Sequence, residues 1–87
     1  MADRIRLQIV TPDGPALETD VNYVNLPTPE GSVGILADHA PMLCAVGRGR
    51  VRYRSGDGEG SLFVTGGVAS VEDNKMTVLA EAAGTEE

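Results

Sequence analysis

The feature that most constrains this chain is a short-range alternation of polar and apolar residues, broken repeatedly by Gly and Pro. Residues 4–10 alternate in strict period two, which is typical of a β-strand with one buried face. Residues 11–14 (TPDG) then supply the residue types that tight turns favour. Further short runs with this character are predicted to be strands, and they cover residues 17–19, 21–26, 33–36, 42–46, 48–54, 61–65, 68–71 and 76–80.

These short strands predict an all-β fold. No window of eleven or more residues carries a helical apolar stripe, and turn residues recur every several positions. Residues 55–60 (SGDGEG) are predicted to form a loop, and residues 82–87 a frayed tail. Many short strands with Gly/Pro turns indicate a β-sandwich or barrel. We expect one domain spanning residues 1–87, without repeats or linkers.

Composition limits what this domain can do. The chain has 87 residues, 41% of them hydrophobic, and its single cysteine excludes an internal disulfide framework. No apolar run approaches the roughly 18 residues of a membrane helix, so we expect a soluble, intracellular protein without direct lipid insertion. Thirteen acidic against seven basic side chains give a net charge of −6, which argues against nucleic acid as a partner.

The only histidine, His39, follows Asp38 and invites a general-base interpretation. Adjacent residues on a strand point to opposite faces, so this pair does not orient itself as a base and its carboxylate. We favour a structural or contact role for His39. His39 and Cys44, five residues apart, match no zinc spacing, and Cys44 is interpreted as a small buried hydrophobe. We predict no catalytic residue, no metal site and no cofactor.

One strand carries a concentration of positive charge. Period-two spacing places Arg50, Arg52 and Arg54 on one face, opposite Val51 and Tyr53. A solvated outer face that discourages edge-to-edge aggregation is the favoured interpretation. Contact with an acidic partner protein is the alternative, and both stay open on the sequence alone.

Several motifs, in order along the chain, resemble a known family. They are residues 9–14 (IVTPDG), 24–28 (VNLPT), 31–43 (GSVGILADHAPML), 64–71 (VTGGVASV) and 78–81 (VLAE). Together they resemble the N-terminal domain of the epsilon subunit of the F-type ATP synthase, called delta in mitochondria. The pattern Gly-Ile-Leu-x-x-His-Ala-Pro is the most specific part of this resemblance.

The resemblance implies a flattened β-sandwich of about ten strands and a non-catalytic place in the central stalk. There the domain would bind the gamma subunit, rest on the c-subunit ring, and help couple proton flow to ATP synthesis. It would be peripheral, at the cytoplasmic face of the energy-transducing membrane. The resemblance implies c-ring contacts at Pro29, Glu30, Gly31 and Ser32. It implies gamma contacts at His39, Ala40, Pro41 and Met42.

Two departures from the family pattern matter. Many relatives carry an acidic residue where Ser32 stands, and Glu30 would serve instead. Relatives usually continue into a C-terminal helical hairpin, whereas this chain stops shortly after residues 82–84, so the hairpin's inhibitory and ATP-sensing roles are not carried over. Alternatives from other classes are a free-standing β-sandwich that binds a peptide or small ligand, and a small hydrolase using His39.

Overall fold

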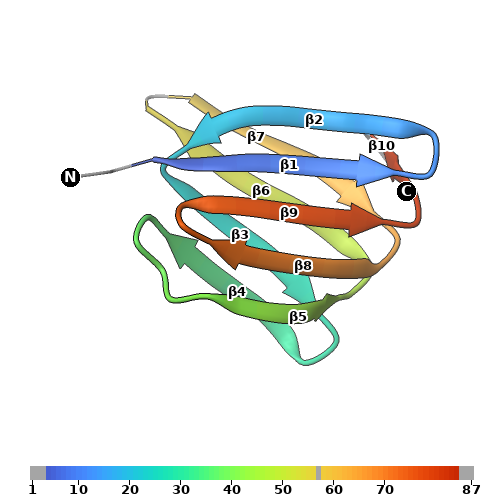
Figure 1. The fold of residues 1–87 in the computed structure, drawn as a ribbon. Helices are drawn as coiled ribbons and strands as arrows, with labels where there is room; N and C mark the ends of the chain where they lie inside the picture. The colour runs from blue at the N-terminus through green and yellow to red at the C-terminus, as the bar shows by residue number, and fades with distance from the viewer. Residues whose placement is uncertain (1–3, 57, 85–87) are drawn as a thin grey trace.

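The computed structural model describes residues 4–56 and 58–84, which form two five-stranded sheets (Figure 1). Sheet A has the order β2-β1-β9-β8-β5, and sheet B has the order β10-β7-β6-β3-β4. The strands of sheet A are β1 (Ile5–Thr11), β2 (Gly14–Val21), β5 (Met42–Val46), β8 (Gly67–Glu72) and β9 (Lys75–Ala80). Those of sheet B are β3 (Tyr23–Thr28), β4 (Gly31–Leu36), β6 (Gly49–Ser55), β7 (Gly58–Val64) and β10 (Ala83–Gly84). The all-β sandwich expected from the sequence is confirmed.

Alternate residues of the strands fill the space between the sheets. In β1, Ile5, Leu7 and Ile9 are buried while Arg6 between them is exposed. The same alternation in the other strands assembles one apolar core without a buried polar side chain in the described residues. Its other members are Val21, Val24, Leu26, Ile35, Val46, Val51, Val64, Ala69, Val71, Met76, Val78 and Ala80.

The prediction that residues 55–60 form a loop is wrong. β6 continues to Ser55 and β7 begins at Gly58, and Tyr53 pairs with Gly60 across the two strands. A Cβ at position 60 would lie 2.4 Å from the Tyr53 hydroxyl oxygen. The glycine is therefore a strand residue that makes room for a large ring, and does not mark a turn.

The ends of the strands also differ from the sequence-based expectation. β2 starts at Gly14, because it pairs with β1 along its whole length despite a bulge near Ile9. Ala83 and Gly84 pair with β7, within the segment expected to fray. The Thr65 amide donates to the Ala82 carbonyl oxygen at 3.2 Å, which ties this short strand to the sandwich. Residues 85–87 lie outside the described residues.

Two hairpins end in the same four-residue motif. In residues 11–14 (TPDG), the Thr11 hydroxyl donates to the Gly14 carbonyl oxygen and accepts from the Asp13 amide, both at 3.1 Å. In residues 28–31 (TPEG), the Thr28 hydroxyl donates to the Gly31 carbonyl oxygen and accepts from the Glu30 amide. The threonine thus satisfies backbone groups inside each turn and fixes its shape.

Candidate interaction surfaces

The β3–β4 turn presents an acidic tip. Pro29, Glu30, Gly31 and Ser32 are all exposed, and the Thr28 hydroxyl holds the turn from within. Gly31 has φ +122°, a conformation that side-chain-bearing residues rarely adopt. The four residues predicted to contact a ring of c subunits are therefore brought together on a shaped, solvent-facing turn.

The segment that follows β4 is a bend tied to a distant hairpin. Asp38 has φ +64°, and its amide donates to the Asn74 side-chain oxygen at 2.5 Å. The Asn74 side-chain nitrogen donates back to the Asp38 carboxylate at 3.0 Å. This reciprocal pair, which we call the Asp38–Asn74 lock, joins the bend to the β8–β9 turn, where Asp73 and Asn74 both have positive φ.

His39 lies in this bend without a carboxylate beside it. Its Nδ1 donates to the Ala40 carbonyl oxygen at 2.7 Å, since a carbonyl oxygen can only accept. The Asp38 carboxylate is engaged by Asn74. The pair needed for general-base chemistry is therefore not assembled, and the half-buried imidazole is held as a part of the bend.

The segment predicted to contact gamma divides between surface and core. Ala40 and Pro41 are exposed, whereas Met42 packs against the core. Leu43, the next residue, points outward and is 73% exposed. The exposed surface at this place is therefore formed by the neighbours of Met42 more than by the Met42 side chain.

Sequence reasoning missed an apolar row on the outer face of sheet A. Val10, Leu79, Val68 and Ala45 are consecutive partners across β1, β9, β8 and β5. Leu79 is 56% exposed and Val68 is 44% exposed. We use "apolar row" for these four residues together with Leu43, which lies on the same face of β5. One signal in the sequence could have revealed it: β8 and β9 carry apolar residues at successive positions, so that both faces of these strands are partly apolar.

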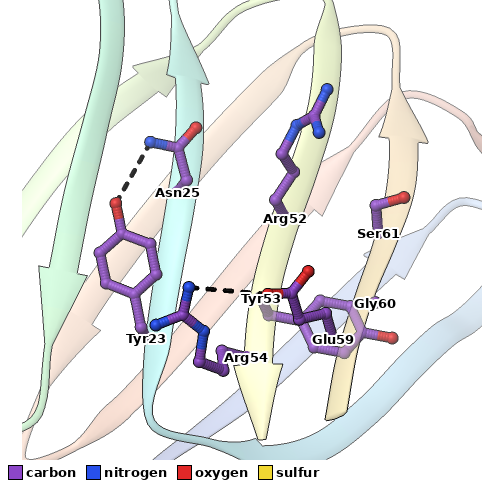
Figure 2. Close-up of a pocket in the computed structure, with 8 residues that line it drawn as sticks. All are labelled: Tyr23, Asn25, Arg52, Tyr53, Arg54, Glu59, Gly60 and Ser61. Atoms are coloured by element: carbon purple, nitrogen blue, oxygen red, sulfur yellow. Dashed lines mark hydrogen bonds and ion pairs between the residues drawn. The ribbon is translucent and has the colours of Figure 1, made fainter.

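The arginines lie as predicted on the outer face of sheet B. Val51 is buried, while Arg52 and Arg54 are exposed. Arg54 pairs with Glu59 at 3.6 Å, and Arg50 donates to the Ser61 hydroxyl at 3.3 Å. A hollow of about 480 Å³ opens on this face (Figure 2).

The cysteine is only partly buried. Cys44 faces inward and packs against the core, as expected of a small hydrophobe, but it is not fully enclosed. Burial nevertheless raises the pKa of its thiol above the usual value. In the described residues, no group of three or more His, Cys, Asp or Glu side chains is arranged to hold a metal ion.

The predicted contact sites lie at opposite ends of one strand. The acidic turn leads into β4, whose first two residues are Gly31 and Ser32, and the His39 bend follows β4. Six extended residues span about 20 Å, so the two groups of residues are separated by about the length of this strand. No helix in the described part of the chain is long and apolar enough to cross a membrane.

Two packed five-stranded sheets, with the shaped turn and bend at their ends, define an all-β sandwich domain. The chain belongs to the family described as "ATP synthase, Delta/Epsilon chain, beta-sandwich domain", whose model matches residues 4–86.

Curated relatives are named "ATP synthase epsilon chain". One from Maridesulfovibrio salexigens is 46% identical over 83 residues, which are 95% of this chain and 58% of the relative. One from Nitratidesulfovibrio vulgaris (strain Miyazaki F) is 47% identical, over 95% of this chain and 62% of the relative. The chain therefore spans about three fifths of the length of these relatives.

Solved structures share the fold. A chain of a mitochondrial ATP synthase assembly with c-ring from Euglena gracilis superposes with a TM-score of 0.88 at 23% identity, over 95% of this chain and 54% of that chain. A chain of the central stalk and c-ring of the Tetrahymena thermophila mitochondrial enzyme gives 0.76 at 21% identity, over 91% and 64%.

Proposed function

We propose that this chain is a non-catalytic central-stalk domain of an F-type ATP synthase, linking the gamma subunit to the c ring and helping to couple proton flow to ATP synthesis. Family membership over residues 4–86 is the observation that carries the proposal. Relatives named as epsilon chains and a fold shared with central-stalk structures support it. The domain would be peripheral, at the cytoplasmic face of the membrane.

The acidic turn is proposed to meet the c ring. Its exposed Glu30 provides a carboxylate at the tip of the turn. A turn whose backbone groups are already satisfied loses little backbone freedom on docking, so Glu30 is presented from a fixed backbone position.

The apolar row and the His39 bend are proposed to form the gamma surface. Exposed apolar side chains that are contiguous on one face commonly mark protein contacts. Leu43 joins the two features, because it lies in β5 shortly after the bend and belongs to the row. This face is also indented, because a hollow of about 320 Å³ lies beside Leu79 and is bordered by Val10 and Pro12.

Binding to gamma from the same organism tests the proposal. We expect Leu43→Ser and Leu79→Ser to weaken binding about tenfold each, as for buried apolar anchors at interfaces. Leu36→Ser is the matched control, because Leu36 is 61% exposed but lies on sheet B. Isothermal titration calorimetry measures the three affinities, and circular dichroism checks the folds.

The outcome that rejects the proposal is a folded wild-type chain that does not bind gamma. That result would favour the free-standing binding module considered from the sequence. Equal losses for Leu36→Ser and Leu43→Ser would instead remove the apolar row from the interface. The hydrolase alternative requires an assembled base, and both His39 and Asp38 are engaged elsewhere.

A further inference from the structure

The hollow on the outer face of sheet B has a specific cause in the sequence. Cross-strand pairing places Ser61, Arg52, Asn25 and Gly34 in one row across β7, β6, β3 and β4. Ser61 and Gly34 are the small residues of this row. The Tyr23 ring lies beside Gly34, since a Cβ there would be 2.8 Å from the Tyr23 hydroxyl oxygen. The Tyr23 ring therefore covers Gly34 and closes the hollow on the β4 side, so that the hollow is lined by residues of β3, β6 and β7.

This face carries positive charge, whereas the chain as a whole is negatively charged. Arg50, Arg52 and Arg54 all point outward from β6, and Glu59 is the acidic residue among the eight that line the hollow. The chain as a whole has a net charge of −6. Positive charge is therefore concentrated on a surface of an otherwise acidic molecule.

Of these three arginines, Arg52 is the one on which the proposal depends. On sheet A, Arg6 contacts Glu18 at 3.0 Å and Asp20 at 3.1 Å. Within residues 4–56 and 58–84, no comparable hydrogen bond or ion pair engages the Arg52 guanidinium. Figure 2 shows it extended away from the Arg54–Glu59 pair.

Polar groups beside Arg52 complete a recognition surface. The Asn25 side chain donates to the Tyr23 hydroxyl oxygen at 3.4 Å, which leaves the phenolic hydrogen available to donate. The Ser61 hydroxyl lies on the other side, on the neighbouring strand (Figure 2). A guanidinium can bind a carboxylate through two parallel hydrogen bonds. The side chains of Asn25, Tyr23 and Ser61 can then hydrogen-bond to polar atoms of the ligand next to that carboxylate.

We propose that this hollow is a docking site for an acidic segment of a partner protein, with one carboxylate received by Arg52. The charge of the face selects an acidic occupant, and the hollow extends across β3, β6 and β7, a width that suits a peptide segment. The site goes beyond the proposed stalk function. It lies on the outer face of sheet B, whereas the apolar row lies on the outer face of sheet A.

Titration of the ¹⁵N-labelled chain with a hexaglutamate peptide, in low salt, tests this inference. We expect amide shifts to concentrate on β3, β6 and β7, and hexaglutamine to produce none there. Arg52→Gln should weaken hexaglutamate binding about tenfold, as for loss of a charge-assisted contact. Arg52→Lys should retain part of the affinity, since lysine keeps the positive charge but cannot donate two parallel hydrogen bonds to one carboxylate.

Arg4→Gln is the matched control, because it removes the same charge from an exposed residue before β1. It should change the affinity less than twofold, by analogy with exposed rim charges. An equal loss in Arg4→Gln and Arg52→Gln would overturn the site in favour of general charge attraction.

Two other outcomes would overturn the proposal. Inorganic phosphate that reproduces the shifts at equal concentration would indicate a small-anion site. Concentration-dependent shifts of the chain alone would indicate that a second copy occupies the face. Arg52→Gln should bind gamma normally. Failure of gamma binding by the wild type would therefore reject the stalk function without affecting the peptide result.

Discussion

Gly67 occupies a position that a larger residue cannot share. It begins β8 opposite Ala80 with φ +149°. A Cβ built there would lie 1.9 Å from the Leu79 carbonyl oxygen. Gly60 is also crowded, but there the obstacle is the end of the Tyr53 side chain. A side chain can rotate away, whereas a strand backbone in a sheet cannot.

The two glycines therefore differ in their tolerance of alanine. We expect Gly67→Ala to lower the free energy of unfolding by at least about 2 kcal/mol, through steric clash and backbone strain. Gly60→Ala should cost less than half as much, because the Tyr53 ring can move. Urea unfolding followed by circular dichroism measures both. A similar cost for the two variants would contradict the backbone argument.

The reactivity of the Cys44 thiol provides a second prediction about a single residue. Burial raises its pKa in the folded chain, so folding favours the protonated thiol. This contribution is intact below the pKa of the unfolded chain and is lost as the pH rises through the folded pKa. We expect a disulfide reagent at pH 8 to react several-fold more slowly with the folded chain than with the chain in urea. Equal rates, after correction for the effect of urea on a free thiol, would reject the raised pKa.

At the scale of elements, the Asp38–Asn74 lock connects segments that are 36 positions apart in the sequence. The β4–β5 bend has no regular structure from Ala37 to Pro41. The β8–β9 hairpin, by contrast, closes through a two-residue turn in which Asn74 already has the required positive φ. The hairpin thus provides a fixed anchor for the bend that carries His39.

Asn74→Gly removes the lock while keeping a residue that tolerates this φ. We expect a loss of about 1 kcal/mol in unfolding free energy and faster hydrogen exchange at the Asp38 amide. Asp73→Gly is the control, since it changes the same turn without touching the lock. Both stability and exchange should stay near the wild-type values in that variant. Unchanged exchange at Asp38 in Asn74→Gly would show that the bend is held by other contacts.

The sequence predicted those elements in which local pattern and tertiary environment agree. The alternation in residues 4–10 and 48–54 identified strands and their faces, including the outward arginines. The stretch 55–60 was misjudged, because glycine signals a turn locally and only pairing with Tyr53 reveals its place in a strand. The apolar row depends on register among four strands, and none of the other three is next to β5 in sequence. The alternation of polar and apolar residues within each strand does not tell which residues of different strands are paired.

At the scale of the whole molecule, the sandwich separates its two predicted contact regions. The molecule measures 35 × 25 × 23 Å along its principal axes. The acidic turn and the His39 bend are joined directly by β4, which is hydrogen-bonded to β3 along its length. A strand paired in this way transmits position with little bending, so the two regions should move as one body.

Spin labels on cysteines at positions 30 and 39, in a Cys44→Ser background, test this rigidity. We expect a narrow distance distribution centred near about 20 Å plus the label linkers. Pulsed electron spin resonance measures it. A broad distribution would contradict rigid transmission.

The position of β1 in sheet A has a consequence for synthesis of the chain. β1 lies between β2 and β9, antiparallel to the first and parallel to the second (Figure 1). β1 is therefore synthesised before β9, the strand that pairs with its second edge, and that edge stays unpaired until β9 has been made. Until Leu79 has emerged, the nascent chain carries an unpaired edge of Ile- and Val-containing backbone, which is the usual starting point for aggregation. Translation speed through residues 75–80, and chaperones that cover β1 meanwhile, should thus govern the yield of folded protein.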